Sequence, residues 1–359
     1  MSTRVRIGLL RLTDSAPVLV AKERGLFQAL GLHPILSIEP SWANIADKLT
    51  YGLLDAAVML PPLALASTLG LRGPAAKLIV PMGLSQGGNT IVLGGEGMRE
   101  SANAPPGARL LAWLARQSAR PRIAVVHRFS THNLLLRYWL ALTGVDPDHD
   151  IETVVVPPEQ VVPALASGQI AGFCAGAPWG MAAEQAGVGS VLMGTSNIWP
   201  FHPEKCLAVR EDWALAEPEA LTRMLRALMR AQRLCDQGEE ADAVVALLAD
   251  KDGLALPREA VRAALAGGSD HEQIHFHGAG AAFPARPHAA WFLTQMRRWG
   301  WLDAGIDLDA VAGTVYRPDL FALAARMEDL FTPLAFGRGI ASSEAPDPAT
   351  PVRPDSFTF

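Results

Sequence analysis

The sequence has 359 residues, of which 50% are apolar, 31 are Lys or Arg and 36 are Asp or Glu. A chain of this length and composition can build the cores of two ordinary domains. The net charge of -5, without a long basic run, argues against nucleic acid or an anionic membrane surface as a direct partner.

The cysteines and the N-terminal region bear on location. Cys174, Cys206 and Cys235 have neither zinc-site nor disulfide spacing, which suits a reducing compartment. Near the start, only Ile7 to Leu10 form an uninterrupted apolar or glycine run, which is too short for a secretory signal. No later run reaches the ~18 apolar residues that span a bilayer. These features predict a cytoplasmic protein without a membrane anchor.

Strands and helices are predicted to alternate over the first half of the chain. Apolar runs of strand length are followed by longer stretches with helical periodicity. The predicted strands are 5–10, 33–39, 56–60, 77–83, 89–94, 122–127, 151–157 and 171–176, and the predicted helices are 17–31, 42–52, 63–70, 109–119, 131–144 and 159–169. After about residue 205 the pattern becomes helical, with predicted helices at 219–235, 241–251, 257–267 and 288–301.

This alternation predicts an α/β fold with parallel sheets covered on both faces. We expect two lobes, joined by extended crossings near residues 90–100 and 200–210, with a ligand cleft between them. The first lobe would hold residues 1–95 and 205–340, and the second 96–204. The tail 341–359 is rich in Pro, Ser and Asp and is predicted to be mobile.

One turn at a predicted strand end has the features of an anion site. In FSTHNLLLRYW, residues 129–139, Ser130 or Thr131 is a natural N-cap, which places His132 in the first helical turn. Unpaired N–H groups and the helix dipole favour an anion there. A histidine that only caps or packs at the helix start is the alternative.

Several motifs resemble the NrtA/CmpA family of nitrate- and bicarbonate-binding solute receptors. They keep the family's order over residues 5–300, and they are LTDSAP (12–17), AKERGLF (21–27), SWANIADKL (41–49), SQGG (85–88), THNLLLRYWLALTGVDPD (131–148), TVVVPPEQVV (153–162), GFCAGAPWG (172–180) and IWPFHPEKC (198–206). The resemblance implies a periplasmic-binding-protein-like fold of type II, with a hinge between two lobes.

The resemblance also implies a binding site for nitrate or nitrite. The family's site residues correspond to Trp42, Gln86, His132 and Lys205, with Pro158, Ala175 and Gly176 nearby through their backbone. Bicarbonate binders alter the histidine and lysine positions, so keeping both favours nitrate or nitrite. Lys205 would supply a full positive charge, and Gln86 and His132 directed donors. The set implies no catalytic residue, cofactor or metal.

Some positions depart from the family pattern or suggest another site. The family's PGGTH turn is replaced by HRFSTH, and Ala177 stands where an acidic residue is commoner, which bears on selectivity and on lobe closure. The segment DHEQIHFH holds His271, His275 and His277, but this spacing matches no standard zinc site, so no metal is predicted there.

The predicted location decides among three functions. A cytoplasmic member of this family resembles the nitrate/nitrite sensors of the NasS type, which hold an RNA-binding ANTAR-family antiterminator (NasT-like) inactive and release it when the anion binds. One alternative is the substrate-binding component of a nitrate ABC transporter. Another is a cytoplasmic enzyme of the thiamine-pyrimidine or menaquinone class, since the same fold hosts both.

Overall fold

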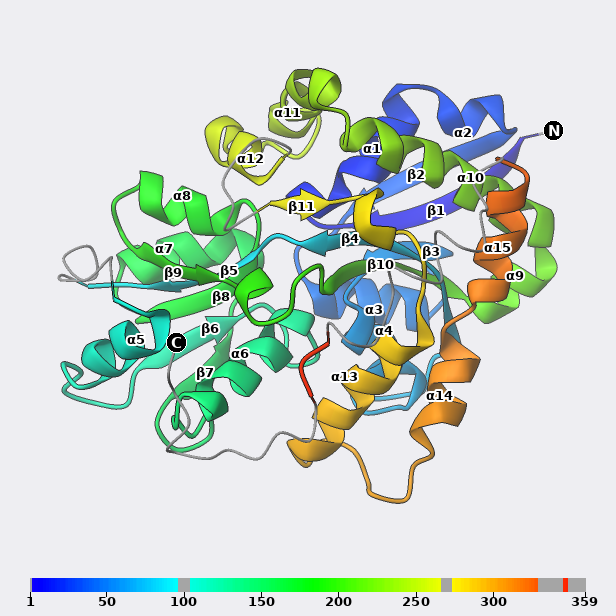
Figure 1. Cartoon of the computed structure of the whole chain (residues 1–359). Coiled ribbons are helices and arrows are strands. Elements are labelled where there is room, and N and C mark those ends of the chain that lie inside the picture. Colours follow the sequence, from blue (N-terminus) through cyan, green and yellow to red (C-terminus); the bar gives the residue numbers. More distant parts are fainter. Residues whose placement is uncertain (1, 96–103, 266–272, 329–344, 348–359) are drawn as a thin grey trace.

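The computed structural model describes residues 2–95, 104–265, 273–328 and 345–347. Two sheets lie side by side, each flanked by helices (Figure 1), and this confirms the predicted α/β fold with two lobes. No helix in these ranges combines the length and apolar character needed to cross a membrane.

The first lobe is built on a six-stranded sheet with the order β11-β4-β10-β3-β1-β2. Its strands are β1 (Thr3–Leu9), β2 (Leu32–Ile38), β3 (Ala56–Met59), β4 (Leu78–Gly87), β10 (Pro203–Arg210) and β11 (Ile274–His275). Its helices are η1 (Thr13–Ser15), α1 (Ala16–Glu23), α2 (Leu26–Ala29), α3 (Trp42–Thr50), α4 (Pro61–Thr68), α9 (Glu211–Ala216), α10 (Pro218–Cys235), η4 (Gly238–Glu240), α11 (Ala241–Ala249), α12 (Arg258–Ala264), η5 (Gly278–Gly280), α13 (Arg286–Arg298), α14 (Leu308–Val315) and α15 (Pro318–Arg326).

The second lobe is built on a five-stranded sheet with the order β7-β6-β8-β5-β9. Its strands are β5 (Asn89–Leu93), β6 (Arg122–Val125), β7 (Glu152–Val155), β8 (Gly172–Gly176) and β9 (Ser190–Gly194). Its helices are α5 (Pro106–Leu114), α6 (Thr131–Leu142), η2 (Pro158–Gln160), α7 (Val161–Ala166), α8 (Trp179–Gln185) and η3 (Thr195–Asn197).

Both sheets are mixed, so the prediction of parallel sheets is correct for the pairs of β1 with β2 and β3 and of β6 with β7 and β8, but wrong for the other strands. β10 runs antiparallel to β3 and β4, and β5 runs antiparallel to β8 and β9. The reason is the chain path, because β5 enters the second sheet and β10 re-enters the first directly from the other lobe, without a crossover helix.

The chain crosses between the lobes at Gly88, immediately after β4, and returns between η3 and β10. Residues 89–93 therefore pair in the second sheet, although the predicted boundary at residue 95 assigned them to the first lobe. The predicted helix at 17–31 is also interrupted. Gly25, with φ of 66°, separates α1 from α2, because this left-handed backbone does not continue a helix.

The predicted mobile tail lies mostly outside the described residues. Its described part, 345–347, contacts helices of both lobes. In the first lobe, the Trp291 indole donates a hydrogen bond of 2.8 Å to the Pro346 carbonyl. In the second lobe, the Tyr138 hydroxyl donates a hydrogen bond of 3.1 Å to the Asp347 carbonyl.

Candidate functional site

The N-terminus of α6 carries His132 into the boundary between the lobes. Ser130 is the N-cap and accepts from the Asn133 backbone N–H at 3.2 Å, which confirms the predicted cap. His132 is 1% exposed. Its Nε2 lies 3.1 Å from Ser130 Oγ and its Nδ1 lies 3.6 Å from Glu204 Oε1. The imidazole therefore faces a carboxylate that sequence reasoning did not select.

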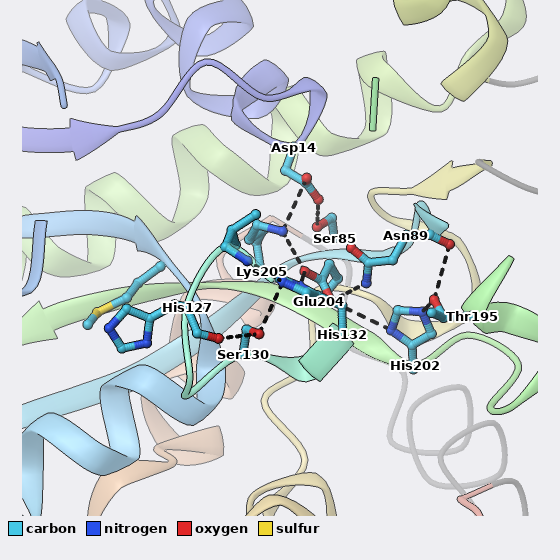
Figure 2. A network of polar contacts seen from close by, with 12 residues as sticks. Asp14, Ser85, Asn89, His127, Ser130, His132, Thr195, His202, Glu204 and Lys205 are labelled. Atoms are coloured by element: carbon cyan, nitrogen blue, oxygen red, sulfur yellow. Dashed lines mark hydrogen bonds and ion pairs between the residues drawn. The ribbon is translucent and has the colours of Figure 1, made fainter. Parts of the chain in front are cut away.

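Lys205 lies on β10 and is 1% exposed. Its Nζ is 2.6 Å from Glu204 Oε1 and 3.3 Å from Asp14 Oδ2, where Asp14 belongs to η1 (Figure 2). The Ser85 hydroxyl, on β4, donates to the other oxygen of Asp14. The sequence predicted Lys205 as the full positive charge of the site, but in the structure two buried carboxylates surround it.

Further polar groups surround Glu204, which is also buried. The Asn89 amide donates to Glu204 Oε2 at 2.5 Å, and His202 Nδ1 lies 3.8 Å from the same oxygen. On its other side, His202 Nε2 lies 2.7 Å from Thr195 Oγ1. Both carboxylate oxygens of Glu204 therefore have polar partners, and these partners come from both lobes (Figure 2).

The pKa values of the two carboxylates beside Lys205, Asp14 and Glu204, are shifted in opposite directions. Burial raises the pKa of Asp14, with Lys205 only opposing that effect. Burial also favours a higher pKa for Glu204, but the opposing effects of Lys205, His132 and His202 are larger. The net result is a pKa of Glu204 lowered to about 2. Lys205 thus stabilises ionised Glu204 more, in line with the shorter distance, and Asp14 is the carboxylate that accepts a proton more readily.

The basic groups of the site also have shifted pKa values. Burial lowers the pKa of Lys205, but Asp14 and Glu204 outweigh it, so the pKa of Lys205 is raised and the ammonium stays charged. Burial lowers the pKa of His132 despite Glu204, and lowers the pKa of His202 to about 4. Both imidazoles are therefore predominantly neutral near neutral pH.

Four of the predicted site residues meet this cluster. Lys205 Nζ lies 5.6 Å from the centre of the Trp42 ring, and the buried Trp42 N–H has no acceptor among the described residues. A Cβ added to Gly176 would lie 3.6 Å from Lys205 Nζ. The predicted residues Trp42, His132, Gly176 and Lys205 are therefore close together in space.

The other three predicted residues lie beside the cluster or apart from it. Gln86 lines a small cavity together with Lys205, and its Oε1 is buried without a donor among the described residues. Ala175 precedes Gly176 on β8 and pairs with Thr90. Pro158, by contrast, lines another small cavity with Leu10, Arg11, Glu39, Pro40 and Glu159.

Sequence reasoning missed Asp14 and Glu204, although both lie within quoted motifs, LTDSAP and HPEK. Adjacent residues of a regular strand point to opposite faces, so Glu204 and Lys205 would not be expected in one site. The pairing of β10 with β4 is irregular on both sides of Lys205, between Pro203 and Lys205 and between Lys205 and Cys206. This irregularity brings both side chains to the same cluster.

The histidine-rich segment does not form a metal site in the described residues, where no group of three potential ligands comes together. His271 lies outside the described residues. The His275 ring contacts the Phe201 ring at 5.1 Å, and the His277 backbone N–H donates to Asp236.

Arginines and aromatic rings join the two lobes next to α6. Trp301, which follows α13, makes an edge contact with Phe129 at 5.8 Å, and the Arg128 guanidinium lies 4.6 Å from the Trp301 ring centre. Arg137 of α6 lies 4.4 Å from the ring centre of Trp299. We call these five residues the interlobe clasp, and its cation–π contacts hold the helix that carries His132 against the first lobe.

Comparison with known proteins places these features in context. Residues 1–249 match the model of the NMT1-like family. The chain is 32% identical over 342 residues to the nitrate/nitrite binding protein NrtA of Synechococcus elongatus, covering 90% of this chain and 77% of that protein. It is 35% identical over 333 residues to the nitrate import ATP-binding protein NrtC of Synechocystis sp., covering 89% of this chain but only 49% of that longer protein.

A solved structure agrees with these relatives. The crystal structure of the periplasmic nitrate-binding protein NrtA from Synechocystis superimposes with a TM-score of 0.87 at 29% identity, covering 92% of this chain and 90% of that chain. The superposition confirms the predicted periplasmic-binding-protein fold.

Proposed function

The chain belongs to the NMT1-like family and to the NrtA-type nitrate/nitrite-binding proteins within it, and from this premise we propose that it binds nitrate or nitrite at the cluster around Lys205. We further propose that it serves as the solute-binding component of an ABC-type importer. The similarity to the nitrate import ATP-binding protein NrtC supports this role, although the chain spans 49% of that relative.

The observation that carries the proposal is a concentration of buried polar atoms without hydrogen-bond partners around Lys205. Buried polar groups in folded proteins are nearly always paired, so a cluster of unpaired ones indicates a missing polar ligand. Four such atoms lie at the cluster, and they are Asp14 Oδ2, Trp42 Nε1, Asn89 Oδ1 and His132 Nδ1. Asp14 Oδ2 and His132 Nδ1 have ion-pair partners at 3.3 Å and 3.6 Å but no hydrogen bond. They come from both lobes, as expected for a ligand held between them.

Nitrate suits the donors of this cluster. It is a planar, weakly hydrated monoanion, so its desolvation cost is moderate when N–H donors and a cation meet its oxygens. Lys205 supplies the cation, and the unpaired indole N–H of Trp42 supplies a donor that needs an acceptor. Both groups are fixed by packing before the ligand arrives, which lowers the entropic cost of binding.

Calorimetric titration tests this function. We expect sodium nitrate or sodium nitrite to bind with a Kd in the micromolar range, about -8 kcal/mol. Trp42→Phe keeps a ring but removes the unpaired N–H, so it should weaken nitrate binding about tenfold, corresponding to one lost hydrogen bond to an anion.

The matched control is Trp113→Phe. Trp113 is also a buried tryptophan, in the second lobe, but its N–H already donates to the Gly94 carbonyl at 2.8 Å. This variant should bind nitrate as the wild type does. Binding of bicarbonate in place of nitrate and nitrite would identify another ligand, and no heat with any of the three anions would refute the proposal.

The regulatory function predicted from the sequence uses the same ligand but another partner. A cytoplasmic sensor would release an ANTAR-family antiterminator on binding nitrate, whereas an import component would dock on a permease–ATPase complex. Co-purification with and without nitrate separates the two. An RNA-binding partner lost on nitrate addition supports the sensor, and a membrane-bound ATPase as partner supports import.

A further inference from the structure

Three polar groups converge beside Gly176. A Cβ added there would lie 3.3 Å from Asn89 Oδ1, 3.5 Å from Asp14 Oδ2 and 3.6 Å from Lys205 Nζ. All three atoms therefore border the same part of the Gly176 backbone. A ligand bound at the cluster around Lys205 would have to satisfy these groups at this end of the site.

Two of these three atoms accept hydrogen bonds. The orientation of the Asn89 amide follows from its Nδ2, which donates to Glu204, so its Oδ1 faces Gly176 as an acceptor. Asp14 Oδ2 is buried and accepts no hydrogen bond from the described residues, although Lys205 Nζ lies 3.3 Å away as its ion-pair partner. Nitrate and nitrite carry no protons, so their oxygens would be repelled by an ionised Asp14.

The charges of the cluster also disfavour binding of nitrate or nitrite while Asp14 is ionised. Asp14 and Glu204 bring two negative charges when ionised, against one positive charge on Lys205, and all three groups are at most 1% exposed. In the described part of the chain, the remaining titratable group that interacts with Asp14 from another element is His132 on α6, and its ring is predominantly neutral. A monoanion would therefore add a second uncompensated negative charge in a buried site, which is unfavourable.

We propose that Asp14 is a specificity-determining residue that takes up one proton from solvent when nitrate or nitrite binds and, as a neutral carboxylic acid, donates a hydrogen bond to a ligand oxygen. The proton resolves both conflicts at once, because it turns Asp14 Oδ2 into a donor and cancels the added charge. The inference rests on the proposed function of the same site.

The raised pKa of Asp14 agrees with this role, since burial already disfavours its ionised form before any anion arrives. Glu204 is the poorer candidate, because both its oxygens are engaged by Lys205 and Asn89. Selectivity follows from the same residue. An anion that brings its own hydroxyl proton, such as bicarbonate, can donate to an ionised Asp14 and so avoids the first of the two conflicts, although not the added charge.

Calorimetry of the full chain with sodium nitrate tests the proposal. Titrations in two buffers of different ionisation enthalpy give the number of protons taken up, and we expect about one per nitrate near neutral pH. Nitrate affinity should fall about tenfold for each pH unit above the pKa of Asp14 in the free protein.

Asp14→Asn places a permanent donor at this position. We expect this variant to bind nitrate without proton uptake, with an affinity independent of pH between about 6 and about 8.5, and at the upper end at least as tightly as the wild type. The control is Asp55→Asn, because Asp55 is also buried but pairs with Arg6 away from the site. That variant should keep the pH dependence of the wild type.

The possible failures are distinguishable. Nitrate binding without net proton uptake, or a pH dependence that persists in Asp14→Asn, overturns the assignment to Asp14 and leaves the proposed function intact. A loss of nitrate binding in Asp14→Asn at every pH also overturns it, since the site would then require the carboxylate. Absence of nitrate binding by the wild type at any pH refutes the proposed function itself.

Discussion

Replacing Lys205 by Met removes the only cation that contacts Asp14 or Glu204 among the described residues. The methionine fills most of the volume, so the main effect is electrostatic. Removing one partner of a buried ion pair leaves an uncompensated charge and costs about 3 to 5 kcal/mol. Here two carboxylates lose their partner, so we expect a loss near the upper end of that range in the absence of ligand.

The matched control is Arg317→Met. Arg317 is also 2.6 Å from its partner, Asp319, but the two side chains are 32% and 54% exposed. Water can therefore solvate the Asp319 carboxylate when Arg317 is removed. We expect Arg317→Met to cost about 1 kcal/mol or less.

Urea denaturation of the ligand-free proteins, followed by circular dichroism, measures both changes in the free energy of unfolding. The penalty of Lys205→Met should shrink as the pH falls, because protonation of Asp14 removes one of the unpaired charges. Equal losses for the Lys205 and Arg317 variants, or a penalty that grows in acid, would refute the electrostatic account of the cluster.

Three further predictions concern Gly176, the interlobe clasp and acid stability. Gly176→Ala places a methyl group 3.3 to 3.6 Å from Asn89, Asp14 and Lys205 and should weaken nitrate binding at least tenfold, whereas Gly305→Ala, which meets no atom within 4 Å, should leave titrations unchanged. Trp301→Ala removes ring contacts between the lobes worth roughly 1 to 2 kcal/mol and should weaken nitrate binding about tenfold. Trp213→Ala, on α9 and outside the clasp, should have no effect on nitrate affinity, and an equal loss in both variants would contradict a role for the clasp. The pKa of His202 is lowered to about 4 in the folded protein, so its neutral form stabilises the fold above its ordinary pKa and this contribution is lost as the pH falls from about 6.5 to about 4. Between these pH values the free energy of unfolding, measured by urea denaturation, should fall by up to about 3 kcal/mol less in His202→Gln than in the wild type. Identical pH profiles of the two proteins would show that His202 is not responsible.

Local features of the fold could be predicted because short segments determine them. The cap of α6 needs only Ser130 and the helical run after it, and both are visible in the sequence. The direction of β5 and β10 could not be predicted in this way, because it depends on the path of the chain between two lobes. No local pattern distinguishes an antiparallel strand that arrives from another lobe.

The sequence predicted where the candidate site lies, but not which charged groups it contains. His132 and Lys205 do meet, as expected from the motifs that contain them. The two carboxylates were overlooked because an acid beside a lysine usually lies on the opposite face of a strand. Only the irregular pairing of β10 with β4 brings Glu204 and Lys205 together, and such irregularities depend on tertiary packing.

The crossings between the lobes pass directly through the site, and this separates affinity from closure. Lys205, Glu204 and Asn89 lie on the strands next to the crossings, where a rotation of the lobes would move atoms least. Groups near the pivot would contact a ligand almost equally in the open and the closed arrangement of the lobes. They therefore contribute to ligand affinity without favouring closure. The leverage must come instead from groups that reach the cluster from elements outside the crossing strands, such as Trp42 on α3 and His132 on α6. Substitutions at the pivot should therefore change how tightly the anion binds, and substitutions at the two helices should change how far its binding shifts the lobes.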